Sequence, residues 1–222
     1  DNKKMSPFDR NSIYGMYNRT ENYQSDCSYI SQIKAFKDNV SIKSCLSYTF
    51  SVSNSQGASL IKDRPFTAEM TRSIMLLKEK PYRPRMADYR IGVFFTGREQ
   101  LGEGAKTTAP VYYANRWDIQ PSDTAAYLRG EKVKPTKQIV FYIDNTFPEK
   151  WKPYLREGVT QWNELFEQIG FKDVVAAKDF PTDDPEFDPD NIKYSCVRYA
   201  PSSIENAMGP SWVDPRSGEI LN

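Results

Sequence analysis

Apolar and polar side chains alternate along part of the first half of the chain. Between Val40 and Val52, apolar residues recur at about every second position, and serine, threonine and lysine fill most of the others. After a loop predicted at 54–65, the alternation returns from Phe66 to Leu76. A period of two is typical of a strand that buries one face. The two stretches therefore predict the arms of a long antiparallel hairpin.

Two further strands are predicted after this hairpin. Ile91, Val93 and Phe95 alternate in one of them, and the other covers 111–119. The glycine-rich connection 97–110 lacks the Gly-Lys-Ser/Thr of a phosphate-binding loop, and the residues after it predict a strand instead of a helix. The first part of the chain, to about residue 120, thus predicts an antiparallel sheet with one face in solvent.

The pattern changes in the second half of the chain. A strand is predicted at 138–144, then a helix from Pro148 to Ile169 that Gly170 ends, then strands at 172–179 and 193–200. Apolar residues three and four positions apart line the helix: Trp151, Leu155, Val159, Trp162, Leu165, Phe166 and Ile169. We expect this face to pack against a sheet.

A charged, proline-bearing stretch separates the two patterns. It follows a short predicted helix that Gly130 ends. We place a domain boundary here, between residues 130 and 131. The predicted fold class is α+β, with an antiparallel β-rich N-terminal domain at 1–130 and a strand–helix–strand portion at 131–222.

Composition narrows the classes of partner. The net charge is +1 with both signs well mixed, which gives no electrostatic basis for a nucleic-acid partner. Apolar runs fall short of the roughly 20 residues that a membrane span requires. The three cysteines lie far apart, so that either a Cys27–Cys45 disulfide or free thiols are compatible with the sequence.

Candidate catalytic groups are few. The chain contains no histidine, which excludes imidazole bases and nucleophilic triads built on them. Glu157, Glu164 and Glu167 fall on the polar side of the predicted helix, where we expect them in solvent. The stretch 179–191 concentrates six acidic residues, which suits calcium, but its spacing matches no EF-hand and its three prolines favour a stiff, solvated loop.

Two long strings in the second half carry a family resemblance. QIVFYIDNTFPEKWKPYLREGVTQWNELFEQIGFKD and YSCVRYAPSSIENAMGPSWVDPRSGEIL closely resemble the opening of the catalytic domain in a family of large bacterial secreted zinc-dependent metalloproteases of metzincin type. MLLKEKPYRPRMADYRIGVFF and YANRWDI resemble the β-rich domain that precedes it in the same family. The resemblance covers nearly the whole chain, and IENAMGPSWVDPRSGEIL is a long ungapped match.

The resemblance implies a zinc peptidase that this chain does not complete. Metzincins bind zinc through histidines of an HExxHxxGxxH helix, which is absent here. We therefore expect a truncated catalytic domain that is inactive alone, with no catalytic or metal-binding residue of its own, and zinc held by ligands beyond residue 222. The parent would cleave peptide or protein substrates and would be secreted, periplasmic or attached to the cell envelope.

The resemblance also suggests a substrate-binding segment. In metzincins an edge strand of the upper sheet pairs with the extended substrate. The candidates for that strand are Asn206, Met208, Gly209, Pro210 and Ser211. The alternative is that Met208, Trp212 and Ile220 pack the domain while 214–218 turns between two strands.

Two further hypotheses concern the β-rich part. Asp88 lies among Arg83, Arg85 and Arg90, and is either a plug that blocks the zinc of a latent parent enzyme or a member of a structural ion pair. The rival to a peptidase is a non-catalytic module of a cell-envelope protein. It would present aromatic side chains of its sheet, namely Tyr112, Tyr113 and Trp117, to a glycan or a protein.

Overall fold

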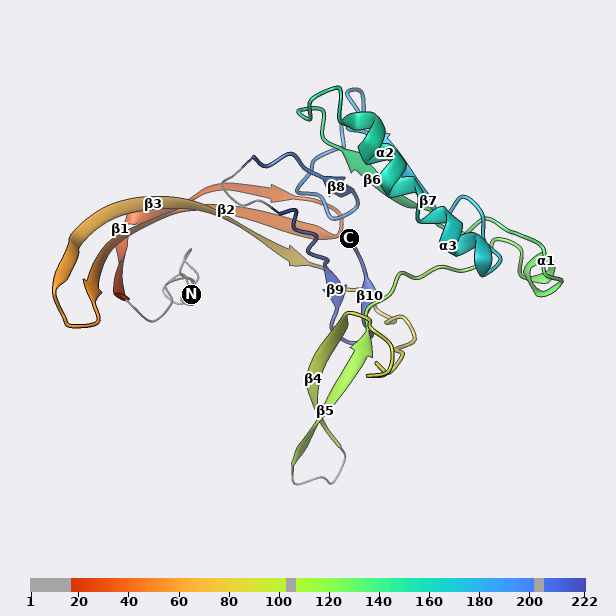
Figure 1. Ribbon diagram of the computed structural model, residues 1–222, viewed down its shortest axis with the longest axis horizontal. Helices are drawn as coiled ribbons and strands as arrows, with labels where there is room; N and C mark the ends of the chain where they lie inside the picture. Colours follow the sequence, from red (N-terminus) through yellow and green to blue (C-terminus); the bar gives the residue numbers. More distant parts are fainter. Residues whose placement is uncertain (1–16, 103–106, 202–205) are drawn as a thin grey trace. The chain divides into compact units, whose positions relative to one another are not determined.

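The computed structural model describes residues 17–102, 107–201 and 206–222 (Figure 1). The chain divides into two compact units, Asp1–Met75 and Leu76–Asn222. The boundary expected between residues 130 and 131 lies inside the second unit, and as a boundary between sequence domains it stays a prediction. The predicted β-rich character is confirmed, because antiparallel strands dominate the elements of the structure.

The first unit contains one antiparallel sheet of three long strands. They are β1 (Tyr17–Ala35), β2 (Asn39–Asn54) and β3 (Ser59–Met75), in the order β1-β2-β3. The predicted hairpin is confirmed by pairs such as Val40 with Ile74, but the loop predicted at 54–65 is too long, because β3 starts at Ser59. Leu46 and Tyr48 of β2 are buried, and the Tyr48 ring stacks on Phe66 with centroids 5.2 Å apart. Cross-strand aromatic pairs of this kind stabilise a sheet.

The second unit begins with a smaller hairpin. It consists of β4 (Phe95–Leu101) and β5 (Thr108–Ala114), and Phe95 pairs with Ala114 at its open end. The strand predicted at 91–95 is wrong in position, because β4 begins only at Phe95 and extends to Leu101, inside the connection predicted at 97–110. The strand predicted at 111–119 ends at Ala114. The Gly-Ala-Lys part of the connection lies at 103–106, outside the described residues.

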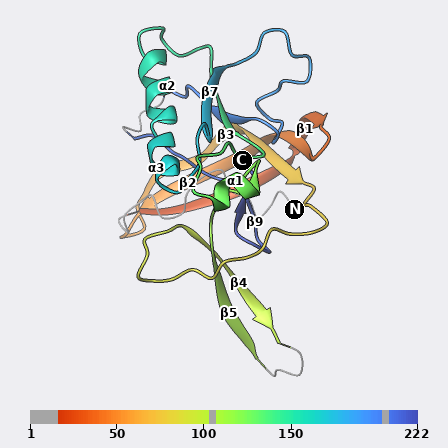
Figure 2. The same ribbon diagram turned by 90° about the vertical axis from the view of Figure 1, so that its right-hand side faces the viewer.

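The strand–helix–strand portion forms a parallel sheet in the order β7-β6-β8. Its strands are β6 (Ile139–Ile143), β7 (Val175–Asp179) and β8 (Ser195–Val197). The helices α2 (Lys152–Thr160) and α3 (Asn163–Gln168) connect β6 to β7 and follow one another along one side of the sheet (Figures 1 and 2). A short helix, α1 (Thr124–Leu128), precedes them and is capped by Asp123. The core beneath consists of Ala126, Val133, Ile139, Phe171, Val174 and Val175.

The single helix predicted for 148–169 is divided in two. Gln161 and Trp162 have the dihedral angles of a 3₁₀ turn, which tightens the chain between α2 and α3. Immediately after it, the side-chain amide of Asn163 donates to the carbonyl of Val175 and accepts from its N–H, both at 2.8 Å. The Asn163 side chain thus makes the two hydrogen bonds that the backbone of a neighbouring strand would make with Val175. These bonds attach the helical segment to the first residue of β7.

The apolar side chains of the helical segment are only partly buried. Val159 and Phe166 pack against the core, and Leu155 is half-buried. The other four that the sequence pattern assigned to the sheet are exposed, namely Trp151 (43%), Trp162 (60%), Leu165 (54%) and Ile169 (57%). The prediction that these four pack against the sheet is therefore wrong.

A two-stranded hairpin closes the described chain. Its strands are β9 (Val213–Asp214) and β10 (Glu219–Ile220). The N–H of Arg116 donates to the carbonyl of Gly218, and the N–H of Ile220 donates to the carbonyl of Arg116, both at 2.9 Å. The hairpin is therefore seated on the segment that follows β5. Among the described residues, no helix is long and apolar enough to cross a membrane.

Candidate functional site

The five candidate substrate residues lie in an exposed, irregular segment. Asn206, Met208, Gly209, Pro210 and Ser211 all precede the first residue of β9 and belong to no strand. Met208 is 77% exposed. The segment is accessible, but the edge strand expected here is absent from it. Contact of these residues with a peptide stays a prediction.

The turn predicted for 214–218 is confirmed. It connects β9 and β10, as the alternative interpretation required. The packing expected of two residues in that alternative is wrong, since Met208 and Trp212 are both exposed. The regular secondary structure of this region is therefore the hairpin 213–220, and the segment 206–212 before it is exposed to solvent.

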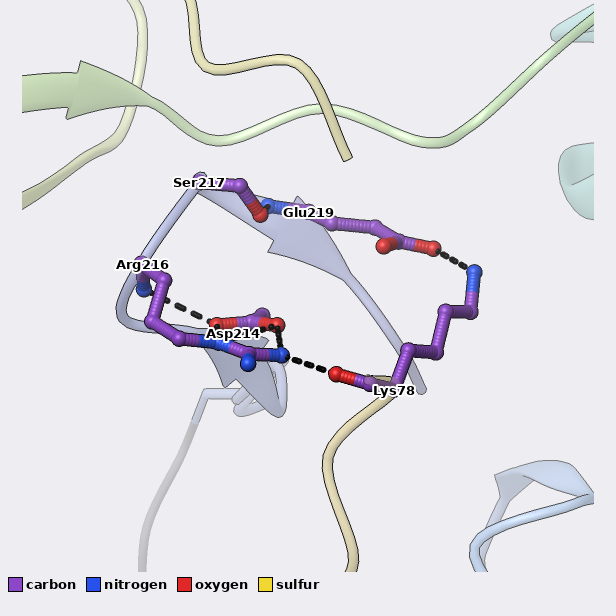
Figure 3. Close-up of polar contacts among 5 residues, drawn as sticks. All are labelled: Lys78, Asp214, Arg216, Ser217 and Glu219. Carbon is purple, nitrogen blue, oxygen red and sulfur yellow. Dashed lines mark hydrogen bonds and ion pairs between the residues drawn. The ribbon is translucent and has the colours of Figure 1, made fainter. Parts of the chain in front are cut away.

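A buried carboxylate organises this turn (Figure 3). The side chain of Asp214 is only 1% exposed and accepts hydrogen bonds from the backbone N–H, Nε and Nη2 of Arg216, at 2.9, 3.0 and 2.7 Å. The Arg216 guanidinium holds the pKa of Asp214 below its usual value, because it stabilises the ionised form. Asp214 is therefore ionised at neutral pH and does not act as a proton donor there.

A second buried acid binds the segment that precedes the β4–β5 hairpin. Glu219 is 3% exposed, and its Oε1 forms an ion pair with Nζ of Lys78. The carbonyl of Lys78 accepts a 2.6 Å hydrogen bond from Nη2 of Arg216. Lys78, Asp214, Arg216 and Glu219 form what we call the four-charge clamp, in which two cations neutralise two buried anions (Figure 3). Sequence analysis missed Lys78 and Glu219 as a pair, and no local pattern connects residues so far apart.

The four-charge clamp stabilises the fold through paired charges. Each carboxylate has a cation within hydrogen-bonding distance, so the charges of the clamp are paired within it. Oε2 of Glu219 is buried and has no hydrogen-bond partner among the described residues. Removal of either cation would leave a buried charge uncompensated, which is strongly destabilising.

The ion pair predicted for Asp88 is confirmed. Its carboxylate accepts from Nε and Nη2 of Arg90, at 2.9 and 2.6 Å, and from the backbone N–H of the same residue. The Arg90 side chain holds the pKa of Asp88 below its usual value. Arg83 and Arg85 act through their backbone carbonyls, which accept from Arg116 and Ala114. A latency role for Asp88 in a longer protein stays a prediction.

The acidic stretch 179–191 uses its carboxylates to order its own backbone. Asp184 accepts from the N–H of Glu186 and from the hydroxyl of Tyr194, each at 2.9 Å, and these bonds lower the pKa of Asp184. Asp179, at the end of β7, binds Nη2 of Arg156 through both oxygens at 2.7 Å. In the part of the chain that the structure describes, no three acidic, cysteine or histidine side chains come together as a metal site.

The aromatic face proposed for a binding module is mostly packed. Tyr113 is buried beneath Arg98, whose guanidinium lies 5.0 Å from the ring centroid. Trp117 packs edge-on against Phe141 beside the core. Only Tyr112 is exposed. These three side chains do not form a common platform.

The three cysteines are free thiols, which was one of the two alternatives from the sequence. Cys27 is exposed and Cys45 is half-buried. Cys196 lies in β8, where burial raises the pKa of its thiol to about 11. A thiol in that state is a poor nucleophile at neutral pH.

The second unit of this β-rich chain thus contains a small parallel sheet with a helical crossover, followed by the hairpin 213–220 that the four-charge clamp holds. Comparison of the sequence with family models finds a domain of unknown function, DUF5117, over residues 1–122. This match covers more than half of the 222 residues, and the chain belongs to that family. No curated protein and no solved structure matches the chain.

Proposed function

We propose that this chain is the N-terminal region of a secreted zinc-dependent metallopeptidase and that it supplies the scaffold of the substrate cleft. The basis is the resemblance of 137–221 to the opening of a metzincin-type catalytic domain. The DUF5117 part would precede the catalytic domain as a β-rich module. On this proposal the chain is inactive alone, and peptide hydrolysis belongs to the longer protein.

One structural observation supports this proposal most directly. The resemblance implies a strand, a long helix and then further strands. The second unit has β6, then α2 and α3, then β7 and β8, in one parallel sheet. A helical crossover between neighbouring parallel strands buries one face of such a sheet.

The residues present do not fit a zinc site. The sequence has no histidine, and its three cysteines lie in β1, β2 and β8. We therefore derive no catalytic step for this chain. Its own contribution would be to hold the hairpin 213–220 in place through the four-charge clamp, which leaves the preceding segment 206–211 accessible to a peptide.

The test uses the longer protein. Its coding sequence should contain an HExxHxxGxxH motif after the codon for Asn222, and the purified protein should hydrolyse an unstructured protein such as casein. A zinc chelator should abolish this activity, and added zinc should restore it. The matched control is the same protein with the motif glutamate replaced by glutamine, and the 222-residue chain alone should show no activity. Absence of the motif, or hydrolysis unaffected by the chelator, would refute the proposal.

A further inference from the structure

The hairpin of β4 and β5 has one side without a neighbouring strand (Figure 1). β4 pairs with β5, and no other described strand pairs with it. On the other side of the hairpin, the segment 85–87 covers β5. The N–H of Ala87 donates to the carbonyl of Tyr112 at 2.8 Å, and the N–H of Ala114 donates to the carbonyl of Arg85 at 2.9 Å. The outer side of β4 is therefore the open edge of this small sheet.

The hydrogen bonds of the sheet determine which backbone groups of β4 point outward. In an antiparallel ladder, pairs that exchange two hydrogen bonds alternate with pairs that exchange none. Tyr112 and Ala114 bond to the segment outside the hairpin. Their facing residues on β4, Gly97 and Phe95, therefore belong to pairs that exchange none. The backbone N–H and C=O groups of Phe95, Gly97 and Glu99 point away from β5, and none of them bonds to a described residue.

This open edge lacks the features that usually block one. Phe95, Gly97 and Glu99 are all exposed. Proteins commonly protect a sheet edge with proline, lysine or a bulge, but the seven residues of β4 contain neither proline nor lysine, and their register with β5 does not shift. By contrast, the outer edge of β5 beyond the segment 85–87 carries Pro110, which has no N–H to offer. The hairpin thus has one protected edge and one that is available to a further strand.

Two aromatic side chains lie beside the open edge on the exposed face of the hairpin. Phe95 and Tyr112 contact each other edge-on, with ring centroids 5.3 Å apart. A Cβ at Gly97 would stand 3.1 Å from the Tyr112 ring, so this ring lies across the glycine. No side chain at position 97 separates the ring from the edge. An apolar side chain of an added strand opposite Gly97 would therefore pack directly on Tyr112.

The other face of β4 carries a cation. The Nη2 of Arg98 donates to the Tyr113 hydroxyl at 3.1 Å, and its guanidinium lies over the same ring. Arg98 has no carboxylate partner among the described residues. An acidic residue opposite it on an added strand would supply that partner, since opposite charges across a strand pair are stabilising.

From these observations we propose that β4 binds an extended polypeptide segment as an added antiparallel strand. The segment is apolar where it faces Phe95 and Gly97, and acidic where it faces Arg98. Addition of a strand to an open edge is a general mode of peptide recognition, in which the main chain provides affinity and alternate side chains provide specificity. Antiparallel pairing is chosen because it is slightly more stable per residue than parallel pairing. The inference does not rest on the peptidase proposal.

A second copy of β4 fits this edge poorly. In a two-fold antiparallel pair of β4 strands, the register with the greatest overlap places Arg98 opposite Arg98. The next two registers place Glu99 opposite Glu99 or Glu99 opposite Phe95. Like charges directly opposite each other are destabilising, and a carboxylate beside an aromatic ring loses solvent without gaining a partner. The occupant that the edge favours is therefore a different segment, with the complementary pattern.

The probe is the acetylated and amidated peptide Val-Thr-Gln-Glu-Phe-Thr-Val, which places phenylalanine opposite Gly97 and glutamate opposite Arg98. Fluorescence anisotropy of a labelled peptide with the 222-residue chain should show saturable binding with a dissociation constant below about 1 mM. N-methylation at the third and fifth residues removes two donors that face β4, and should weaken binding at least about tenfold. N-methylation at the fourth and sixth residues is the matched control, because those N–H groups point away from β4, and it should leave binding within about threefold of the original.

Variants of the chain test the same edge. Glu99→Pro removes an outward N–H without breaking a bond to β5, and should weaken binding at least about fivefold. Glu99→Gln keeps that N–H and should bind as the original chain does. Amide hydrogen exchange followed by NMR should show that the peptide slows exchange at Phe95, Gly97 and Glu99 but not at Thr96 and Arg98. The same spectra show whether the hairpin of Glu99→Pro stays folded.

Three outcomes would overturn the proposal. The first is no binding of the peptide at about 1 mM, and the second is equal weakening by both methylation patterns. The third is a chain that self-associates through β4, as measured by sedimentation velocity, and leaves the peptide unbound, which would make a second copy the occupant.

Discussion

The α-carbon of Gly218 lies against the backbone carbonyl of Ala114. A Cβ at Gly218 would stand 2.5 Å from that carbonyl oxygen, and the residue also has a φ of +76°. Both the distance and the left-handed backbone exclude an ordinary side chain. The turn between β9 and β10 therefore contacts the end of β5 at Gly218, the one residue of the turn without a side chain.

Gly218→Ala should lower the free energy of unfolding of the second unit by at least about 2 kcal/mol. Urea unfolding followed by tryptophan fluorescence measures this, because all four tryptophans lie in that unit. Gly209→Ala is the matched control, since a Cβ there meets nothing within 4 Å in the described chain. Equal stability of the two variants would show that the hairpin is not seated on β5.

Asp214→Asn should destabilise the second unit in a pH-dependent way. Arg216 holds the pKa of Asp214 below its usual value, so the ionised carboxylate favours the folded state. That contribution is complete above the unfolded pKa of about 3.9, and it is lost as the pH falls through the lower folded pKa. We expect a loss of about 1–3 kcal/mol at neutral pH, which shrinks in acid.

Urea unfolding at neutral and at acidic pH, with Asp183→Asn as the control, checks this expectation. Asp183 is exposed in the acidic loop, and its replacement should change little at either pH. A loss from Asp214→Asn that is the same at both pH values would contradict an ionic role for this side chain.

Asn163→Ala should cost about 1–3 kcal/mol, since it removes two hydrogen bonds to the backbone of Val175. Asn163→Asp should cost more at neutral pH, because a carboxylate oxygen would then face the Val175 carbonyl. Facing the Val175 carbonyl raises the pKa of that carboxyl in the folded state, and protonation supplies the missing donor. The excess should therefore shrink as the pH falls through this raised pKa and vanish below the unfolded value of about 3.9. Urea unfolding across that pH range, with Gln168→Ala on the exposed face of α3 as the control, measures both effects. A variant Asn163→Asp as stable as the original chain would refute the paired hydrogen bonds.

The cysteines should differ in their reactivity. Cys27 is exposed, whereas burial raises the pKa of Cys196 to about 11. The thiolate is the reactive form, so at about pH 8 iodoacetamide should modify Cys27 at least about tenfold faster than Cys196. Peptide mass spectrometry after timed labelling gives both rates, and unfolding in concentrated guanidinium chloride should make them similar. Comparable rates in the folded chain would mean that β8 opens readily.

The parts of the fold that the sequence predicted depend on regular burial. The pairing of β2 with β3 was predictable because apolar residues recur at alternate positions in both strands, although β2 also buries the polar side chains of Asn39, Ser41 and Ser44. β1 was not, because most of its side chains are exposed and its register shifts between Gln24 and Tyr29. In the helical segment the sequence instead predicted too much burial. Exposed and buried apolar faces of a helix have the same spacing of three and four residues, so the pattern does not distinguish them.

The candidate site was predicted only where its cause is local. The turn at 214–218 follows from Asp-Pro and Ser-Gly within five residues. The ion pair between Lys78 and Glu219 joins residues 141 positions apart, and only the fold brings them together. An edge strand at 206–211 was expected from the resemblance alone, and the alternation that forms strands is absent there.

Residues 76–122 belong at once to the family match of 1–122 and to the second compact unit. Lys78, Ala114 and Arg116 all contact the hairpin 213–220. A chimera joined after residue 122 would place the hairpin 213–220 of one protein against the segment 76–122 of another. The hairpin would then lose its own contacts with Ala114 and Arg116 and its own counterion, Lys78. Chimeras between members of this family should therefore be joined after Met75, because all four residues of the clamp then come from the same protein.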